Sequence, residues 1–118
     1  MITKKINKDV YKVSKIVKEF QLPYYAVIFS SQRTDGDKGY AKMADKMVEL
    51  ASLQEGFLGV ESARDNELGI TVSYWSSLES IKKWKNHSAH LIAQEKGKKV
   101  WYQSFSLRVC KVERDNFF

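Results

Sequence analysis

Two histidines and a tryptophan lie close together in this 118-residue chain and are its first candidates for chemistry. His87 and His90 follow Trp84 by three and six residues, so an unbroken helix would bring all three to one side. An imidazole can move a proton near pH 7 or ligate a metal or haem iron, and an indole ring can stack on a flat ligand. The alternative is that Trp84 belongs to the core and that the histidines are surface or capping residues.

The other motifs in the chain exclude several kinds of site. Two histidines without a neighbouring cysteine do not supply the four ligands of a structural zinc site, so we expect no metal. A calcium loop starting at Asp35 would put Lys46 at position 12, where a bidentate Glu is required. Phosphate-binding, dinucleotide-binding and nucleophile-elbow glycine motifs are absent from the sequence. Cys110 alternates with apolar neighbours, so we expect an unreactive thiol, and a single cysteine fits a reducing compartment.

The hydrophobic pattern predicts the elements that must position these residues. It favours strands over residues 24–32, 57–64, 68–75 and 105–113, and helices over residues 40–51 and 78–101 with a break at 86–88. Asp37 is expected to cap the first helix, Gly56 to end it, and Ser76 to open a capping box with Glu79. Two helical crossovers around a hairpin predict an α+β, ferredoxin-like sheet of four antiparallel strands with helices on one face.

The first 22 residues form an extension with its own character. Val10, Val13, Ile16, Val17 and Phe20 recur at helical spacing with lysines between them, and Pro23 ends the pattern. We therefore expect an amphipathic N-terminal helix over residues 1–22 and one domain over residues 23–118. Most of the net charge of +6 lies in this extension, where we interpret it as a solvated helix face.

Composition bounds the partners and the compartment. The predicted third strand, LGITVSYW, lacks the aromatic pattern of an RNA-recognition domain, so we expect no nucleic-acid partner. Apolar runs fall short of the roughly 20 residues that span a bilayer, so no membrane partner is expected. The N-terminus lacks the features of a secretory signal, which predicts a cytoplasmic protein.

Strand alternation sorts the side chains between the two faces of the sheet. In the third strand Ile70, Val72 and Tyr74 share one side, which we expect the helices to cover. Trp75 then lies on the opposite face, which is too apolar to stay in water. A second copy of the chain is the simplest cover, so the sequence predicts a homodimer. Other apolar residues expected on that face are Val112 and either Ala26 or Ile28.

Residues Tyr24 to Arg114 resemble the antibiotic biosynthesis monooxygenase family of small dimeric α+β barrel proteins. The resemblance is carried by the first strand YYAVIF, the turn QEGFLG, the strand end VSYW, and S-L-E-x-I-x-x-W-K with a downstream His. It implies a ferredoxin-like protomer, two sheets packed into a barrel, and a substrate cleft between sheet and helices. It also implies oxidation of polyketide-like phenols without metal or flavin.

The haem-degrading members of the family imply a second set of site residues. They carry an Asn on the first strand, a Trp on the second helix and a His further along it. Trp84 matches the helix Trp, whereas the first strand offers Ser30 or Ser31 in place of the Asn. The matching His position falls near Gln94, so His90 would serve only after a shift of about one helical turn.

The sequence therefore yields a leading hypothesis and two alternatives. We expect a monooxygenase that oxidises an aromatic or polyketide-like small molecule with O2 and no cofactor. His90 or His87 would move the proton beside Trp84. The predicted substrate-binding residues are Phe29, Tyr74 and Ser30. The alternatives are a haem-binding or haem-degrading protein, with haem as cofactor, and a non-catalytic dimeric module.

Overall fold

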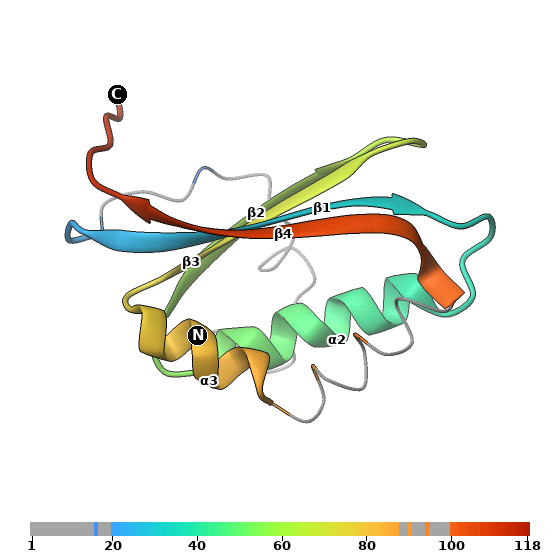
Figure 1. The fold of residues 1–118 in the computed structure, drawn as a ribbon, viewed down its shortest axis with the longest axis horizontal. Coiled ribbons are helices and arrows are strands. Elements are labelled where there is room, and N and C mark those ends of the chain that lie inside the picture. Colours follow the sequence, from blue (N-terminus) through green and yellow to red (C-terminus); the bar gives the residue numbers. More distant parts are fainter. Residues whose placement is uncertain (1–15, 17–19, 88–89, 91–93, 95–99) are drawn as a thin grey trace.

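The part of the chain that the structure describes forms one antiparallel sheet with two helices on one of its faces. The computed structural model describes Ile16, residues 20–87, His90, Gln94 and residues 100–118. The strands β1 (Tyr24–Arg33), β2 (Phe57–Arg64), β3 (Gly69–Trp75) and β4 (Tyr102–Val112) pair in the order β2-β3-β1-β4. The helices α2 (Tyr40–Ser52) and α3 (Leu78–Lys85) both lie below the sheet in Figure 1. The predicted ferredoxin-like α+β fold and its element order are confirmed.

Some predicted elements fall on other parts of the chain. Most of the expected N-terminal helix and of the helical stretch over residues 88–101 lies outside the described residues. The break expected near residue 86 is confirmed, because α3 ends at Lys85 with Asn86 as its C-cap. β4 begins three residues before its predicted start, since Tyr102 already pairs with Arg33 of β1. No helix within the described ranges is long and apolar enough to cross a membrane.

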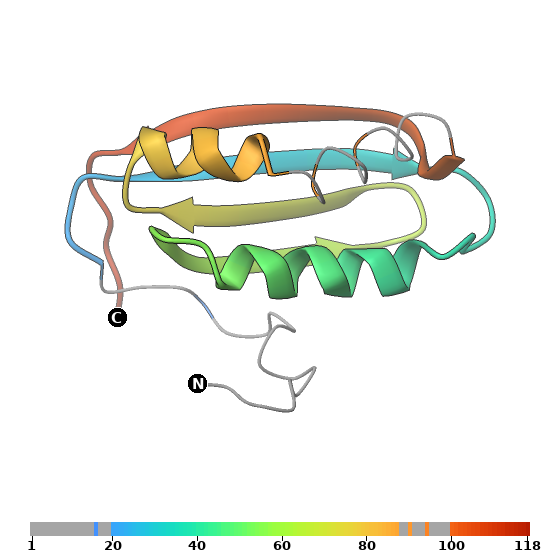
Figure 2. The same cartoon turned by 90° about the horizontal axis from the view of Figure 1, so that it is seen from below.

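The two helices run side by side and in opposite directions beneath the sheet (Figure 2). The N-cap residue of α2 is Gly39 rather than the predicted Asp37, although Asp37 Oδ2 accepts from the backbone N–H of Ala41 in the first turn at 3.1 Å. The cap of α3 is Ser77 rather than the predicted Ser76, and its Oγ accepts from the backbone N–H of Ser80 at 3.0 Å. The backbone N–H of Ser76 donates to the Gly56 carbonyl at 2.8 Å, so it is not available to the Glu79 side chain for the predicted capping box.

Gly56 joins the turn after α2 to the start of α3. Its φ of 89° lies in the left-handed region that favours glycine. A Cβ at this position would lie 2.0 Å from Ser80 Oγ and 2.6 Å from Ser80 Cβ. The first turn of α3 therefore packs directly against the backbone of Gly56, and this contact sets where α3 begins.

The face assignment predicted for β3 is wrong. Trp75 is completely buried, and with Ala51 of α2 and Ile81 of α3 it forms the core between sheet and helices. It pairs with Tyr25, which also packs against this core. A buried indole needs a partner for its N–H, and Ser73, two residues earlier on the same side, accepts it at 2.9 Å. The polar residues of this side therefore support Trp75 instead of marking a solvent face.

Ile70, Val72 and Tyr74 consequently lie on the open face, the side of the sheet turned away from the helices. The pairing of Ala26 with both Tyr74 and Cys110 places those residues on this face too. The predicted facing of β4 is confirmed, with Cys110 and its alternate neighbours on the open side. Ile70 remains 41% exposed, so the open face is more apolar than the sequence analysis expected.

One end of the open face is covered by the chain itself. The Tyr24 hydroxyl donates to Asp115 in the tail after β4 at 2.6 Å, and the Phe20 ring meets the Tyr24 ring edge-on at 5.5 Å. Tyr24 is buried as a result. The tail rises on the side of the sheet away from the helices (Figure 1).

Candidate active site

The three residues predicted to carry catalysis lie together in the structure. The Trp84 ring of α3 stacks on Trp75, with ring centroids 6.3 Å apart and planes 24° apart. The His90 ring lies 4.8 Å from the Trp84 ring and the His87 ring 5.6 Å from it, between centroids. All three side chains are partly buried. Trp84 is therefore both an edge of the core and a flat surface flanked by two imidazoles.

The path that positions Trp84 is short and rigid. β3 ends at Trp75, Ser77 caps α3, and Ile81 turns into the core on the first turn of that helix. Trp84 follows Ile81 by three residues and so lies on the same side of the helix. The core residue Trp75 and the site residue Trp84 are thus joined by a single cap and two helical turns.

The environment of His90 favours its neutral form. Burial lowers the pKa of His90 below its ordinary value of 6.5, and the neighbouring His87 and Lys85 act in the same direction. The Nδ1 atoms of His87 and His90 are buried and have no hydrogen-bond partner within the described residues. A neutral imidazole near pH 7 can accept a proton, which is the property a general base needs.

Phe29 and Tyr74 do not share one cleft, so this part of the prediction is wrong. Phe29 lies on the helix-facing side of β1, where its ring contacts Tyr102 at 5.3 Å and Phe105 at 5.4 Å between centroids. Tyr74 lies on the open face, where its hydroxyl donates to Glu61 Oε1 at 2.7 Å. Burial and the Glu61 carboxylate raise the pKa of Tyr74. The correction follows from the reversed facing of β3.

Ser30 also lies on the other side of the sheet from Trp84. It pairs with Ile70, which places it on the open face. The serine that turns toward the helices is Ser31, which is 3% exposed. Strand alternation could have separated the two serines only if the facing of β1 had been known.

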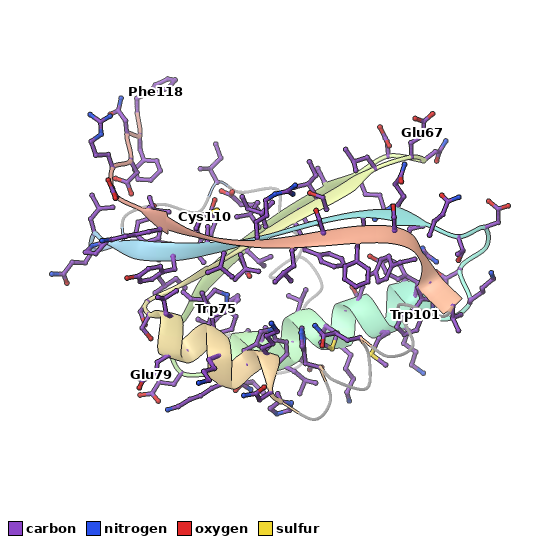
Figure 3. The ribbon with its side chains drawn as sticks, viewed as in Figure 1. Glu67, Trp75, Glu79, Trp101, Cys110 and Phe118 are labelled. Atoms are coloured by element: carbon purple, nitrogen blue, oxygen red, sulfur yellow. The ribbon has the colours of Figure 1, made fainter. Side chains whose placement is uncertain are left out.

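A second cluster on the helix-facing side, near the start of α2, was missed by the sequence analysis. The Arg33 guanidinium carbon lies 3.7 Å from the centroid of the Tyr40 ring, and the Tyr40 ring meets Tyr102 edge-on at 5.7 Å. Arg64 donates through Nη2 to the Ser31 carbonyl at 3.1 Å and to Ser31 Oγ. Tyr102 had been predicted to lie before the last strand, so nothing in the sequence pattern joined these residues. Figure 3 shows Trp75 and Trp101 on this side of the sheet, toward its opposite ends.

The residues present do not fit the haem-degrading arrangement that the resemblance implied. β1 contains no Asn, and its residues facing the helices are Val27, Phe29 and Ser31 near the middle of the strand. The His90 imidazole packs against the ring of Trp84 instead of standing apart from it. Within the described part of the chain, no three His, Cys, Asp or Glu side chains group to hold a metal ion.

Known proteins resemble the chain in sequence and in fold. The chain is 54% identical over 97 residues to the uncharacterized protein YqjZ of Bacillus subtilis, which covers 81% of this chain and 85% of that protein. SnoaB, a cofactor-independent oxygenase from Streptomyces nogalater, superposes with a TM-score of 0.68 at 6% identity, over 78% of this chain and 95% of that one. A conserved protein from Methanosarcina mazei also gives a TM-score of 0.68, at 8% identity, over 77% of this chain and 93% of its own.

The family model gives the same answer over the part of the chain that holds β1 to α3. The model of antibiotic biosynthesis monooxygenases matches residues 23–96, which include Trp84, His87 and His90. The two solved structures share the fold, and the relative from Bacillus subtilis shares more than half of the aligned residues. This chain belongs to the antibiotic biosynthesis monooxygenase family.

Proposed function

We propose that the protein is a monooxygenase that oxidises a flat aromatic small molecule with O2, beside Trp84 on the helix-facing side of the sheet. The observation that carries the proposal is the partly buried Trp84 ring flanked by two imidazoles whose Nδ1 atoms lack partners within the described residues. The ring offers a stacking surface, and the neutral His90 offers a base. Membership of the family supports the reaction class.

The proposed reaction begins with a proton transfer to a histidine. His90 takes a proton from an activated ring methylene of the substrate, which leaves an electron-rich carbanion. The carbanion donates its electrons to O2 and a C–O bond forms. The O–O bond then breaks: one oxygen atom stays on carbon as a carbonyl, and the other leaves as water with both methylene hydrogens. The substrate supplies the electrons, so the balance requires no other reductant.

O2 uptake with a tricyclic anthrone such as dithranol tests this proposal, after subtraction of the rate without protein. We expect turnover by the native chain and a fall in kcat of about 10²–10⁴-fold in His90→Gln, because a positioned general base contributes that much. Lys46→Gln is the control, since Lys46 is exposed on α2 and lies outside both the proposed site and the open face. A double His87→Gln, His90→Gln variant as active as the native chain would exclude the histidine mechanism. O2 uptake by the native chain no faster than the rate without protein would favour a non-catalytic module.

We further propose that the protein works as a homodimer whose two open faces pack together. The support is the apolar character of that face, where Ile28 and Val72 are partly buried and Ile70 is 41% exposed. A two-fold arrangement would pair each patch with its own copy. The site beside Trp84 lies on the other side of the sheet and stays accessible in such a dimer.

A further inference from the structure

Arg64 takes an unusual route across the helix-facing side of the sheet. It is the last residue of the edge strand β2, yet its guanidinium crosses β3 at Gly69 and reaches Ser31 of β1. A Cβ on Gly69 would lie 2.3 Å from three atoms of the Arg64 guanidinium. The absence of a side chain at residue 69 is therefore what opens this route.

The Arg64 guanidinium is hydrogen-bonded to the protein through one of its three nitrogens. Its Nη2 donates to the carbonyl and the hydroxyl of Ser31, which is itself buried. Nε and Nη1 have no hydrogen bond to any of the described residues, and the side chain as a whole is exposed. The guanidinium is thus oriented by the protein while three of its five N–H groups remain for a ligand.

A second cation lies close to the first. The guanidinium carbons of Arg33 and Arg64 lie 3.7 Å and 6.0 Å from the centroid of the same ring, that of Tyr40. The hydrogen bonds of both arginines go to uncharged oxygens. Arg33 donates to the backbone carbonyls of Gly36, Asp37 and Trp101, and Arg64 donates to the carbonyl and hydroxyl of Ser31. Two like charges around one ring repel each other, and an anion between them would relieve that repulsion.

The Tyr102 hydroxyl lies within the electrostatic influence of both arginines. Burial and the Tyr40 hydroxyl raise the pKa of Tyr102, whereas Arg64 and Arg33 both act to lower it. Both arginines therefore favour negative charge at the position of that hydroxyl. An oxyanion placed beside Tyr102 would feel both of them.

An apolar path leads from this cluster toward Trp84. Val27, Phe29 and Ser31 alternate along β1 on the helix-facing side, and Val27, like Trp84, packs against the core around Trp75. Four residues of an extended strand span about 13 Å, which sets the separation of the two ends. Phe29 lies between them with its ring against Tyr102 and Phe105.

We propose that Arg64 binds the carboxylate of an elongated aromatic ligand whose rings extend past Phe29 toward Trp84. The inference rests on the proposed function, because it assigns a chemical class to the ligand of that same side. A carboxylate is preferred because its planar pair of oxygens matches the planar donors of a guanidinium. The aromatic rings of Phe29, Tyr102 and Phe105 would contact the apolar part of the ligand.

Equilibrium binding under anaerobic conditions tests this inference without any turnover. The probes are anthracene-2-carboxylate and anthracene-2-carboxamide, which share their rings and differ in charge, followed by their fluorescence. We expect the native protein to prefer the acid. Arg64→Gln should weaken binding of the acid by about ten- to a hundredfold, because a charge-assisted hydrogen bond is lost, and should leave the amide unchanged. The affinity of Arg64→Lys for the acid should lie between those of the native protein and of Arg64→Gln.

Two further variants separate recognition from folding. Gly69→Ala keeps every charge but pushes the guanidinium off its route, so it should weaken acid binding as Arg64→Gln does. Lys46→Gln removes a positive charge from the exposed side of α2 and should change neither affinity. Thermal unfolding of each variant checks that the fold persists.

The outcomes distinguish this inference from the proposed function. Equal affinity for acid and amide in the native protein, no binding of either, or unchanged acid binding in Arg64→Gln, overturns the role of Arg64 even if an anthrone is oxidised. Preferential binding of the acid that depends on Arg64 supports the role of Arg64 even if no anthrone is oxidised. In that case only the proposed monooxygenase function is refuted.

Discussion

At the scale of single residues, the site depends on one aromatic ring and the groups that touch it. Trp84 stacks on the core residue Trp75 on one side and meets His87 and His90 on another. Its spacing from the histidines was evident from the sequence, but α3 ends at Lys85, so His87 and His90 meet the Trp84 ring from beyond the end of that helix. What the spacing could not supply is the burial that keeps His90 neutral, because burial depends on the packing around the helix.

The lowered pKa of His90 predicts how stability changes with pH. The unfolded chain takes up a proton at His90 near pH 6.5, whereas the folded chain does so only at lower pH. The free energy of unfolding should therefore fall as the pH drops from 6.5 toward the folded-state pKa, and should be unaffected by this group above 6.5. Urea unfolding of the native chain and His90→Gln at several pH values checks this. The two should differ most at the acid end, and parallel profiles would contradict the assignment.

At the scale of elements, the position of α3 decides where Trp84 points. Ser77 caps the helix and Gly56 receives its first turn. The sequence pattern predicted a serine cap at Ser76, one residue before the observed cap. That serine is engaged with the Gly56 carbonyl through its backbone, a contact between segments 20 residues apart that no local motif displays.

Gly56→Ala should therefore disturb the site from a distance. We expect the free energy of unfolding to fall by about 2–5 kcal/mol, from the left-handed backbone and the clash with Ser80 together. Gly39→Ala is the matched control, because Gly39 has a φ of 83° and no atom within 4 Å of its would-be Cβ. It should cost about 1–2 kcal/mol through the backbone alone. Equal losses in chemical denaturation would show that α3 tolerates the extra methyl group.

At the scale of the whole molecule, the sheet separates two faces that differ in their residues. Its helix-facing side holds Trp84 at one end and Arg64 near the other, while its open face carries Ile70, Val72 and Tyr74. The chain's own tail reaches Tyr24 but leaves Ile70 41% exposed. A second copy would complete the cover.

A charge on the open face should separate the proposed dimer. We expect Ile70→Glu to sediment as a monomer at micromolar concentration, because a carboxylate would be buried without a partner at the interface. Leu53→Glu makes the same chemical change at a residue that is 74% exposed at the end of α2, and should remain dimeric. A native chain that sediments as a monomer would refute the packing of two open faces.

Local sequence patterns predicted the order of the strands and helices, the break after Lys85 and the closeness of Trp84 to the two histidines along the chain. These features are local, since periodicity and capping act over a few residues. Alternation also placed Trp75 and Tyr74 on opposite sides of β3. It does not tell which side faces the helices, because both sides of β3 contain apolar residues.

Which side of β3 faces the helices depends on packing between distant parts of the chain. Trp75 turned inward because Tyr25, Phe57 and Ile81 pack around it and Ser73 accepts its N–H. With Trp75 facing the helices, Tyr74 lies on the open face. On β1 it is Ser31 and not Ser30 that faces the helices. Arg64 reaches Ser31 only because Gly69 lies between them on the intervening strand. Cross-strand neighbours come from distant parts of the chain, so packing sets what a local pattern leaves open.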